Sequence, residues 1–111
     1  QVGSFPPPPG SWDLLVNTTP TGTAPDVTHS PVPAAALTGG RTVYDLVYNP
    51  GRTRLLQEAA AAGCRTIGGL DMLVAQAVRQ FEWWCGVRPS SELFKATALA
   101  ALDAPAAEQP V

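Results

Sequence analysis

Residues 42–86 read TVYDLVYNPGRTRLLQEAAAAGCRTIGGLDMLVAQAVRQFEWWCG, and their pattern indicates the fold class. Residues 42–48 are mostly β-branched or aromatic and predict a strand, which a turn sequence terminates. Thr53 can cap a helix that Gly63 ends, and residues 64–67 predict another short strand. This alternation of strands and helices predicts an α/β fold with a parallel sheet and right-handed crossovers.

A long helix follows Gly68 and Gly69. Its apolar residues recur at steps of three and four, which predicts an amphipathic stripe. They are Leu70, Leu73, Val74, Ala77, Phe81, Trp84 and Cys85. Gly86 ends this helix, and a final helix is predicted from Ser90 to Leu102.

The sequence before residue 42 predicts one more strand and a long loop. Residues 13–17 form a short apolar run, typical of a strand buried on both faces of a parallel sheet. Residues 18–33 are rich in Thr, Pro, Gly and Asp, and their place at a strand end favours a functional loop. One helical turn over 33–37 follows, stopped by two glycines.

The chain therefore divides into three predicted parts. Residues 1–12 are a Pro-rich linker that runs extended over the surface. Residues 13–103 hold the predicted strands and helices, and residues 104–111 form a frayed tail. The chain opens on Gln1 without an initiator Met, which indicates an internal piece of a longer protein.

Composition disfavours several classes of protein. The 111 residues are 45% hydrophobic and 14% charged, which is typical of a globular chain. The net charge is −2 and the basic residues are scattered singly, so no nucleic-acid partner is expected. The apolar runs fall far short of the roughly 20 residues that cross a bilayer, so we expect a soluble protein with no membrane partner.

The two cysteines, Cys64 and Cys85, are not in a metal-ligand spacing, and no metal site is predicted. We expect both to be free buried thiols, which fits a reducing cytoplasm.

Four segments, in this order, carry a resemblance to a known family. They are VNTTPTG at 16–22, YDLVYNP at 44–50, Thr53, and GGLDMLVAQ at 68–76. Their combination, over about residues 13–89, resembles the second half of shikimate dehydrogenases.

The resemblance implies the second half of a Rossmann-like parallel sheet, with about three strands, flanked by helices and followed by C-terminal helices. In that family an oxidoreductase transfers hydride between NADP and shikimate or 3-dehydroshikimate, in chorismate and aromatic amino acid biosynthesis. The family's catalytic Lys and Asp and its Gly-rich phosphate loop lie upstream, and this sequence has no G-x-G-x-x-G. The resemblance thus implies no catalytic residue here, a fragment inactive alone, and a missing N-terminal substrate domain as its partner.

By the same resemblance, Tyr48 and Gln76 contact shikimate, and they are expected to meet at a cleft mouth. Tyr48 at a strand end can donate to a carboxylate, and the Gln76 amide can both donate and accept. The alternatives are a packed Tyr with its hydroxyl in solvent and a surface Gln. Leu46 is implied to pack against the nicotinamide, or else to be plain sheet core. Gly69 is implied to let the backbone approach the cofactor.

The loop after the first strand is implied to border the nicotinamide and its ribose through Asn17, Thr18 and Thr19. The alternative is a turn that satisfies its own backbone through Asn and Thr side chains. Thr23 departs from the family, which commonly has Met there, and the following loop is longer in Pro and Thr. The resemblance therefore implies the position of this edge but not its detailed shape.

Four other features receive a structural interpretation. Asp45 inside a strand favours a backbone-holding role over catalysis, because a buried carboxylate needs hydrogen bonds. His29 is expected in solvent, and Lys95 is expected to be a solvated surface charge, with no nearby acid that could serve with it as general acid and base. Trp83 and Trp84 are expected to supply packing area.

Two other hypotheses stay open. One is a stand-alone, non-catalytic α/β interaction module that binds a protein partner through its exposed half-sheet and Trp-bearing helix. The other is a quinate/shikimate dehydrogenase that uses NAD, because the residues that select the cofactor lie outside this chain.

Overall fold

The computed structural model describes residues 2–103, which fall into two compact units, one ending at Gly69 and one beginning at Leu70. We call them unit 1 and unit 2 and describe each by itself. The sequence analysis places residues 13–103 in one part, and this grouping stays a prediction. The predicted tail, 104–111, lies outside the described residues, and residues 2–12 carry no helix or strand.

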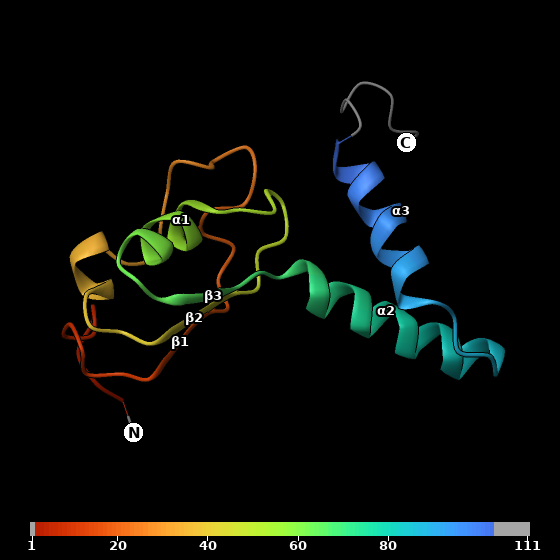
Figure 1. Ribbon diagram of the computed structural model, residues 1–111, viewed down its shortest axis with the longest axis horizontal. Helices are drawn as coiled ribbons and strands as arrows, with labels where there is room; N and C mark the ends of the chain where they lie inside the picture. The colour runs from red at the N-terminus through yellow and green to blue at the C-terminus, as the bar shows by residue number, and fades with distance from the viewer. Residues whose placement is uncertain (1, 104–111) are drawn as a thin grey trace. The chain divides into compact units, whose positions relative to one another are not determined.

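Unit 1 is a three-stranded parallel sheet with helical segments, in the order β1-β2-β3 (Figure 1). This confirms the predicted α/β class and the parallel sheet. Its elements are β1 (Leu14–Asn17), the 3-10 turn η1 (Ala34–Leu37), β2 (Thr42–Asp45), α1 (Arg54–Ala61) and β3 (Arg65–Ile67).

Strand β2 ends three residues earlier than the sequence predicted, at Asp45 rather than at residue 48. The reason is the register: Asn17, the last residue of β1, pairs with Asp45, and the β3 pairing stops opposite Tyr44. The Leu46 amide still donates to the Asn17 carbonyl (3.1 Å), but the residues beyond it have no neighbouring strand. Tyr48 therefore lies past the strand, not at its end.

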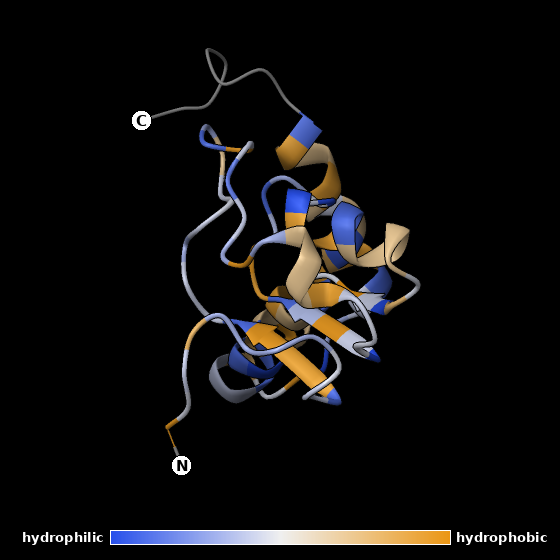
Figure 2. Cartoon of the chain, turned by 90° about the vertical axis from the view of Figure 1, so that its left-hand side faces the viewer, coloured by the Kyte–Doolittle hydropathy of each residue, from blue (hydrophilic) through white to orange (hydrophobic). Residues whose placement is uncertain are grey.

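The core of unit 1 lies on one face of the sheet. Its buried members are Val32, Ala36, Leu37, Val43, Leu55, Leu56, Ala59 and Cys64. The prediction that the first strand is buried on both faces is wrong, because Leu14 and Val16 of β1 are exposed. Figure 2 shows β1 coloured hydrophobic over most of its length. In unit 1, α1 and η1 supply buried side chains only to the face that carries Val43.

Helix α1 begins and ends as its sequence predicts. The Thr53 hydroxyl accepts a hydrogen bond from the Leu56 amide (3.3 Å), which caps a free helical N–H. Gly63 has φ +85°, a left-handed conformation that costs glycine nothing and ends the helix. The Cys64 thiol that follows donates to the Leu37 carbonyl (3.4 Å) and is buried, as predicted.

Unit 2 consists of α2 (Leu70–Cys85) and α3 (Ser91–Asp103), both predicted from the sequence. The rings of Phe81 and Phe94 meet edge to face with centroids 5.8 Å apart. Ser90 caps α3 by accepting from the Leu93 amide (3.2 Å). Only Val74 and Val78 are buried on α2, and α3 has no buried residue.

Two predictions for unit 2 are wrong, and the one for Lys95 is confirmed. Cys85 is exposed rather than buried, because it lies on a helix face that no described residue of unit 2 covers. Trp83 and Trp84 are exposed as well, so they supply little packing area. Lys95 is a surface charge, as predicted, and its Nζ lies 2.9 Å from Asp71 Oδ1. Both side chains of this pair stay largely in solvent, so it is a surface ion pair.

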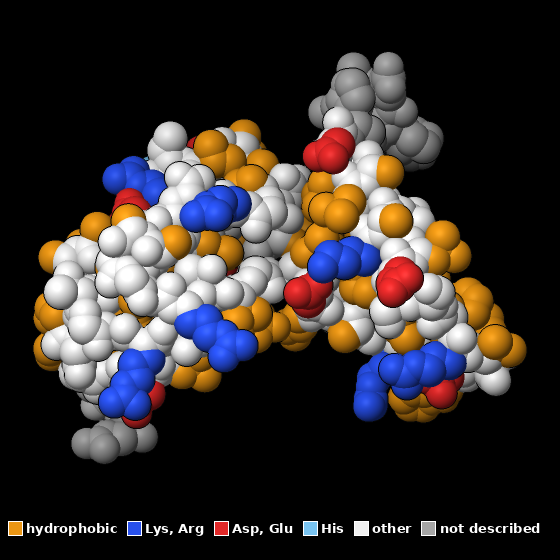
Figure 3. Space-filling model, viewed as in Figure 1, with side chains coloured by type: hydrophobic (Ala, Val, Ile, Leu, Met, Phe, Trp, Pro, Cys, Tyr) orange, Lys and Arg blue, Asp and Glu red, His pale blue; other side chains and the backbone are white. Residues whose placement is uncertain are grey.

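Charge and hydropathy of the described residues agree with the sequence. Figure 3 shows the Arg side chains of unit 1 spread over the visible face rather than gathered in one stripe. None of the helices in the described part of the chain combines the length and the apolar character that crossing a membrane demands.

Candidate functional site

An open pocket of about 490 Å³ lies at the carboxyl ends of β1 and β2. Two segments line it: residues after β1 form the first wall, and residues after β2 form the second. The lining residues are Thr18, Thr19, Pro20 and Thr23 of the first wall, and Leu46, Val47, Tyr48 and Asn49 of the second. The carboxyl edge is where open parallel sheets bind their ligands.

The pocket brings together Leu46, Tyr48, Thr18 and Thr19, four of the residues that the sequence predicted for the site. The two walls are joined by backbone hydrogen bonds. The Leu46 amide donates to the Asn17 carbonyl (3.1 Å), and the Ala24 amide donates to the Asn49 carbonyl (2.8 Å). Both walls are thus held at their two ends.

Asn17 lies beneath the pocket, 4% exposed, and its side chain is fully used within the protein. Its Oδ1 accepts from the amide (3.1 Å) and the hydroxyl (2.6 Å) of Thr19. Its Nδ2 donates to the Thr21 carbonyl (3.2 Å) and to Asp45 Oδ1 (3.1 Å). Its predicted contact with the cofactor stays a prediction, and the side-chain amide already has four partners.

Asp45 is fully buried and accepts three hydrogen bonds. Its Oδ1 accepts from Asn17 Nδ2 (3.1 Å) and from the Val47 amide (3.0 Å), and its Oδ2 accepts from the Thr53 hydroxyl (2.6 Å). The bond to Val47 is the backbone-holding contact that the sequence predicted. Three donors are what a buried carboxylate needs in place of water.

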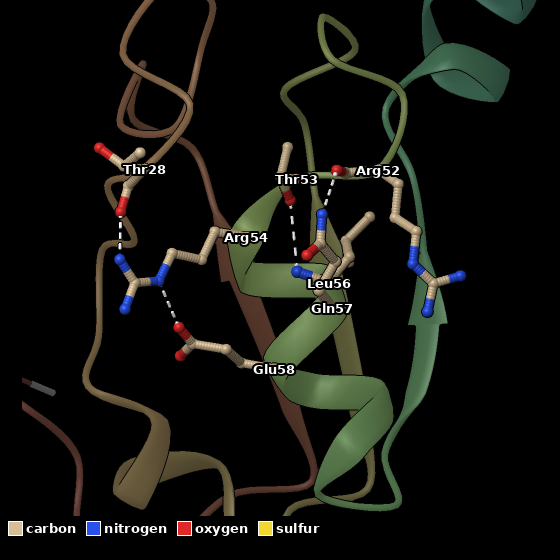
Figure 4. Close-up of polar contacts among 7 residues, drawn as sticks. All are labelled: Thr28, Arg52, Thr53, Arg54, Leu56, Gln57 and Glu58. Atoms are coloured by element: carbon tan, nitrogen blue, oxygen red, sulfur yellow. Dashed lines mark hydrogen bonds and ion pairs between the residues drawn. The ribbon is translucent and has the colours of Figure 1, made fainter.

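The start of α1 is tied to the loop that follows β1. Figure 4 shows the Thr53 cap, with Arg54 beside it reaching the Thr28 carbonyl and Glu58. The Arg54 Nε to Glu58 Oε1 distance is 2.6 Å. Because Thr53 also donates to Asp45, the cap of α1 and the second wall share one buried carboxylate.

Gly69 lies against the second wall of the pocket. A Cβ at this position would overlap the Leu46 carbonyl and come within 2.8 Å of the Val47 carbonyl oxygen. Only glycine therefore fits between β3 and α2. This close approach is to protein backbone, and the predicted approach to a cofactor stays a prediction.

Tyr48 is 42% exposed, and within the described residues its hydroxyl has no hydrogen-bond partner. Its phenol is therefore open to a ligand in the pocket. Gln76 belongs to unit 2, where it lines a second open hollow with Met72, Arg79, Gln80, Glu82, Trp83 and Arg88. The predicted meeting of Tyr48 and Gln76 joins two separately described units and stays a prediction.

None of the described Asp, Glu, His, Lys or Arg side chains lines this pocket. His29 is exposed on the loop, as expected. In the described part of the chain, no three His, Cys, Asp or Glu side chains gather where a metal ion could bind.

Sequence reasoning missed Val47 and Asn49 as lining residues and did not join Asn17, Asp45 and Thr53 into one network. A usable signal was present: Asn17 and Asp45 close adjacent parallel strands, so their side chains meet at one edge.

Comparison with known proteins agrees with this geometry. Residues 69–99 match the family described as "Shikimate 5'-dehydrogenase C-terminal domain". Shikimate dehydrogenase (NADP(+)) of Methanosarcina mazei is 49% identical over 92 residues, covering 83% of this chain and 33% of that protein. The chain matches the carboxy-terminal part of shikimate dehydrogenases. It spans about a third of the length of the curated relatives that it matches.

Solved structures of shikimate dehydrogenases share the fold. The Thermus thermophilus enzyme in complex with NADP(H) and shikimate superposes with a TM-score of 0.73 at 39% identity, over 79% of this chain and 33% of that one. A quinate dehydrogenase from Corynebacterium glutamicum in complex with NAD gives a TM-score of 0.72 at 34% identity, over 82% of this chain and 32% of that one.

Proposed function

We propose that this chain supplies the carboxy-terminal third of an NADP-dependent shikimate dehydrogenase. The complete enzyme is an oxidoreductase that moves hydride between NADP and the shikimate/3-dehydroshikimate pair in chorismate and aromatic amino acid biosynthesis. The observation that carries the proposal is the pocket at the carboxyl ends of β1 and β2, built from VNTTPTG and YDLVYNP. The free buried thiol of Cys64 supports a cytoplasmic location.

The two walls of the pocket would serve the cofactor. Leu46 offers an apolar side chain for the nicotinamide ring, and Thr18 and Thr19 offer hydroxyl and backbone groups near its ribose. Asn17 would act from beneath by shaping the first wall, since its side chain is already bonded. Gly69 permits the tight packing that leads the chain from β3 into α2.

Two residues would contact the substrate. The exposed phenol of Tyr48 can donate a hydrogen bond to a carboxylate, and the Gln76 amide can pair with a hydroxyl as donor and acceptor. NADP, when bound, accepts or donates the hydride. The residues of this chain bind and orient the reactants and exclude water from one side.

The chain alone is expected to be inactive. The described residues that line the pocket include no Lys, His, Asp or Glu. None of these groups is therefore placed to act as a general acid or base beside the reacting atoms. Positioned acid–base groups contribute about 10²- to 10⁴-fold, and orientation of two reactants contributes more. Both would come from the missing N-terminal substrate domain and the first half of the cofactor domain.

The test is a chimera in which residues 13–103 replace the matching third of the Methanosarcina mazei enzyme. We expect shikimate-dependent reduction of NADP by the chimera and none by the 111-residue chain. Tyr48→Phe and Gln76→Ala should lower kcat/KM for shikimate, whereas Arg41→Gln, far from the pocket, should not. A folded chimera that binds NADP but shows no rate with shikimate would contradict the proposal.

A quinate- or NAD-dependent parent is the second candidate, favoured by the likeness to the Corynebacterium glutamicum enzyme. Assaying the complete parent protein with shikimate and with quinate tests the substrate. The cofactor is tested by sequencing the DNA upstream of Gln1 and assaying the complete protein with NAD and NADP. A start codon near Gln1, in place of a continuing reading frame, would instead favour the stand-alone interaction module.

A further inference from the structure

One oxygen atom, Oδ1 of Asp45, joins the two walls of the pocket. It accepts from Asn17 Nδ2 (3.1 Å), and Asn17 holds the first wall through Thr19 and Thr21. It also accepts from the Val47 amide (3.0 Å), which belongs to the second wall. All of these groups are buried or partly buried, so water does not substitute readily for a lost partner.

The other carboxylate oxygen serves a different part of unit 1. Asp45 Oδ2 accepts from the Thr53 hydroxyl (2.6 Å), which caps α1 through the Leu56 amide. Thr53 is 1% exposed and does not line the pocket. The two oxygens therefore have different roles. Oδ1 accepts from the groups that hold the two pocket walls, and Oδ2 accepts from the residue that caps α1.

We propose that Asp45, together with Asn17, is a positioning residue that sets the separation of the two pocket walls through Oδ1. This inference rests on the proposed function, because it assigns the walls to NADP and substrate. Asp45 does not line the pocket itself and acts on ligands only through Leu46–Tyr48 and Thr18–Thr19. Its side chain is thus separate from any group that touches the reacting atoms.

The separate roles of the two Asp45 oxygens can be tested with three variants of this hydrogen-bond network. Asp45→Leu removes both acceptor oxygens. Asp45→Asn keeps one carbonyl oxygen for Asn17 and Val47, while its NH₂ can donate to the Thr53 hydroxyl oxygen. Thr53→Val removes only the Oδ2 bond and the helix cap. Thr53→Val is the matched control, since it destabilises unit 1 without touching either wall.

The first measurement is amide hydrogen exchange and chemical shift by NMR on the 111-residue chain. In Asp45→Leu, the Val47 amide should lose protection, and the Thr19 amide across the pocket should change with it. In Asp45→Asn and Thr53→Val both amides should keep their chemical shifts. In Thr53→Val their exchange should quicken only as much as that of the other amides of unit 1, through global unfolding. If Thr19 does not respond to Asp45→Leu, the coupling of the walls is disproved.

The second measurement is steady-state kinetics in the chimera. A shift of about 1 Å at a reacting site can cost about 10²-fold, so Asp45→Leu should lower kcat/KM by about tenfold to a hundredfold. Asp45→Asn should retain most of the wild-type kcat/KM. Thr53→Val should keep the wild-type kcat/KM despite a lower melting temperature. Equal losses in Thr53→Val and Asp45→Leu would reduce Asp45 to a stability role and overturn the inference.

Two further outcomes are decisive. If Asp45→Asn is as inactive as Asp45→Leu while both amides are unchanged, the carboxylate acts by its charge and positioning is refuted. If Asp45→Leu does not fold, Asn17→Ala takes its place, because it breaks the bond between the walls and leaves Asp45 two donors. An inactive wild-type chimera would sink the proposed function alone, since the amide data on the chain decide the coupling independently.

Discussion

Among the described residues, unit 2 is the more regular in secondary structure, yet only unit 1 has a closed core. In unit 1, Leu37, Val43 and Ala59 are completely buried, and Leu55 is nearly so. In the part of unit 2 that the structure describes, residues 70–103, only Val74 and Val78 are buried, and α3 buries nothing. An apolar stripe at helical spacing therefore predicts a helix, but it does not supply the surface against which the helix packs.

The same contrast applies to polar groups. Unit 1 buries Asn17, Asp45 and Thr53 in one connected network, each bonded to the others directly or through Asp45. The polar contacts of unit 2, such as Lys95 with Asp71, stay in solvent. We expect unit 1 to open only with global unfolding and unit 2 to open more readily, because local stability follows burial and protected hydrogen bonds.

The largest effect that tests this contrast is a cavity in the core of unit 1. Leu55→Ala should lower the free energy of unfolding by about 2–5 kcal/mol, because the lost methyl groups leave a cavity in close-packed surroundings. In a Trp83→Phe/Trp84→Phe background, Trp12 is the sole tryptophan and packs against this core. Urea unfolding followed by Trp12 fluorescence measures the change.

The control is Leu93→Ala in unit 2, where the leucine is exposed. It should stay within about 0.5 kcal/mol of the parent. Comparable losses for the two variants would break the contrast between the units.

The next effect is the tight packing at Gly69. Gly69→Ala should cost about 1–3 kcal/mol, since the added Cβ would overlap the Leu46 carbonyl and force backbone to move. Gly68→Ala is a matched neighbour, because its Cβ would meet the Gly51 oxygen and Leu56 Cδ1 at ordinary distances of 3.6 and 3.8 Å. Thermal melting of the two variants decides: if Gly68→Ala loses as much as Gly69→Ala, the steric account is wrong.

Much of the fold was predictable because its signals are local. Thr53, Gly63 and Gly86 mark helix ends through backbone chemistry that a single sequence displays. The strand end at Asp45 was not predictable from residues 42–48, whose β propensity continues through Tyr48. It is set by where the neighbouring strand ends, at Asn17, and that is a long-range fact.

The candidate site divides in the same way. Thr18, Thr19, Leu46 and Tyr48 were predicted from two motifs, and the parallel register brings them to one pocket. The roles beneath the pocket were not predicted, because they depend on which side-chain oxygen meets which donor. The exposure of Trp84 and Cys85 was not predicted either, since helical spacing cannot tell a covered face from a bare one.

A smaller effect concerns the cap that joins α1 to the buried network. Thr53→Ala should lower stability by about 1–2 kcal/mol, because it removes the cap of the Leu56 amide and a donor to Asp45. Thr53→Ser, which keeps the hydroxyl, should retain most of it. Chemical unfolding of the chain measures both, and an unchanged Thr53→Ala midpoint would show that the network adds no stability to unit 1.

The smallest effect is expected at the ion pair of unit 2. Lys95→Gln should change stability by at most about 0.2–1 kcal/mol, because both side chains are largely exposed and water screens their attraction. The Debye length falls to about 3 Å at 1 M salt, so even this difference should vanish there. Helicity followed by circular dichroism during heating, at low and high salt, measures it.

Arg41→Gln in unit 1 is the matched control. The side chains of Arg41 and Asp13 are even more exposed, and Arg41 Nε lies 3.4 Å from Asp13 Oδ1. The effect of Arg41→Gln on stability should be no larger than that of Lys95→Gln, and it should not alter the melting of the helices of unit 2. A Lys95→Gln loss that survives 1 M salt would mean that the pair with Asp71 is shielded from solvent. Unit 2 would then hold a buried polar contact of its own, and the contrast with unit 1 would narrow.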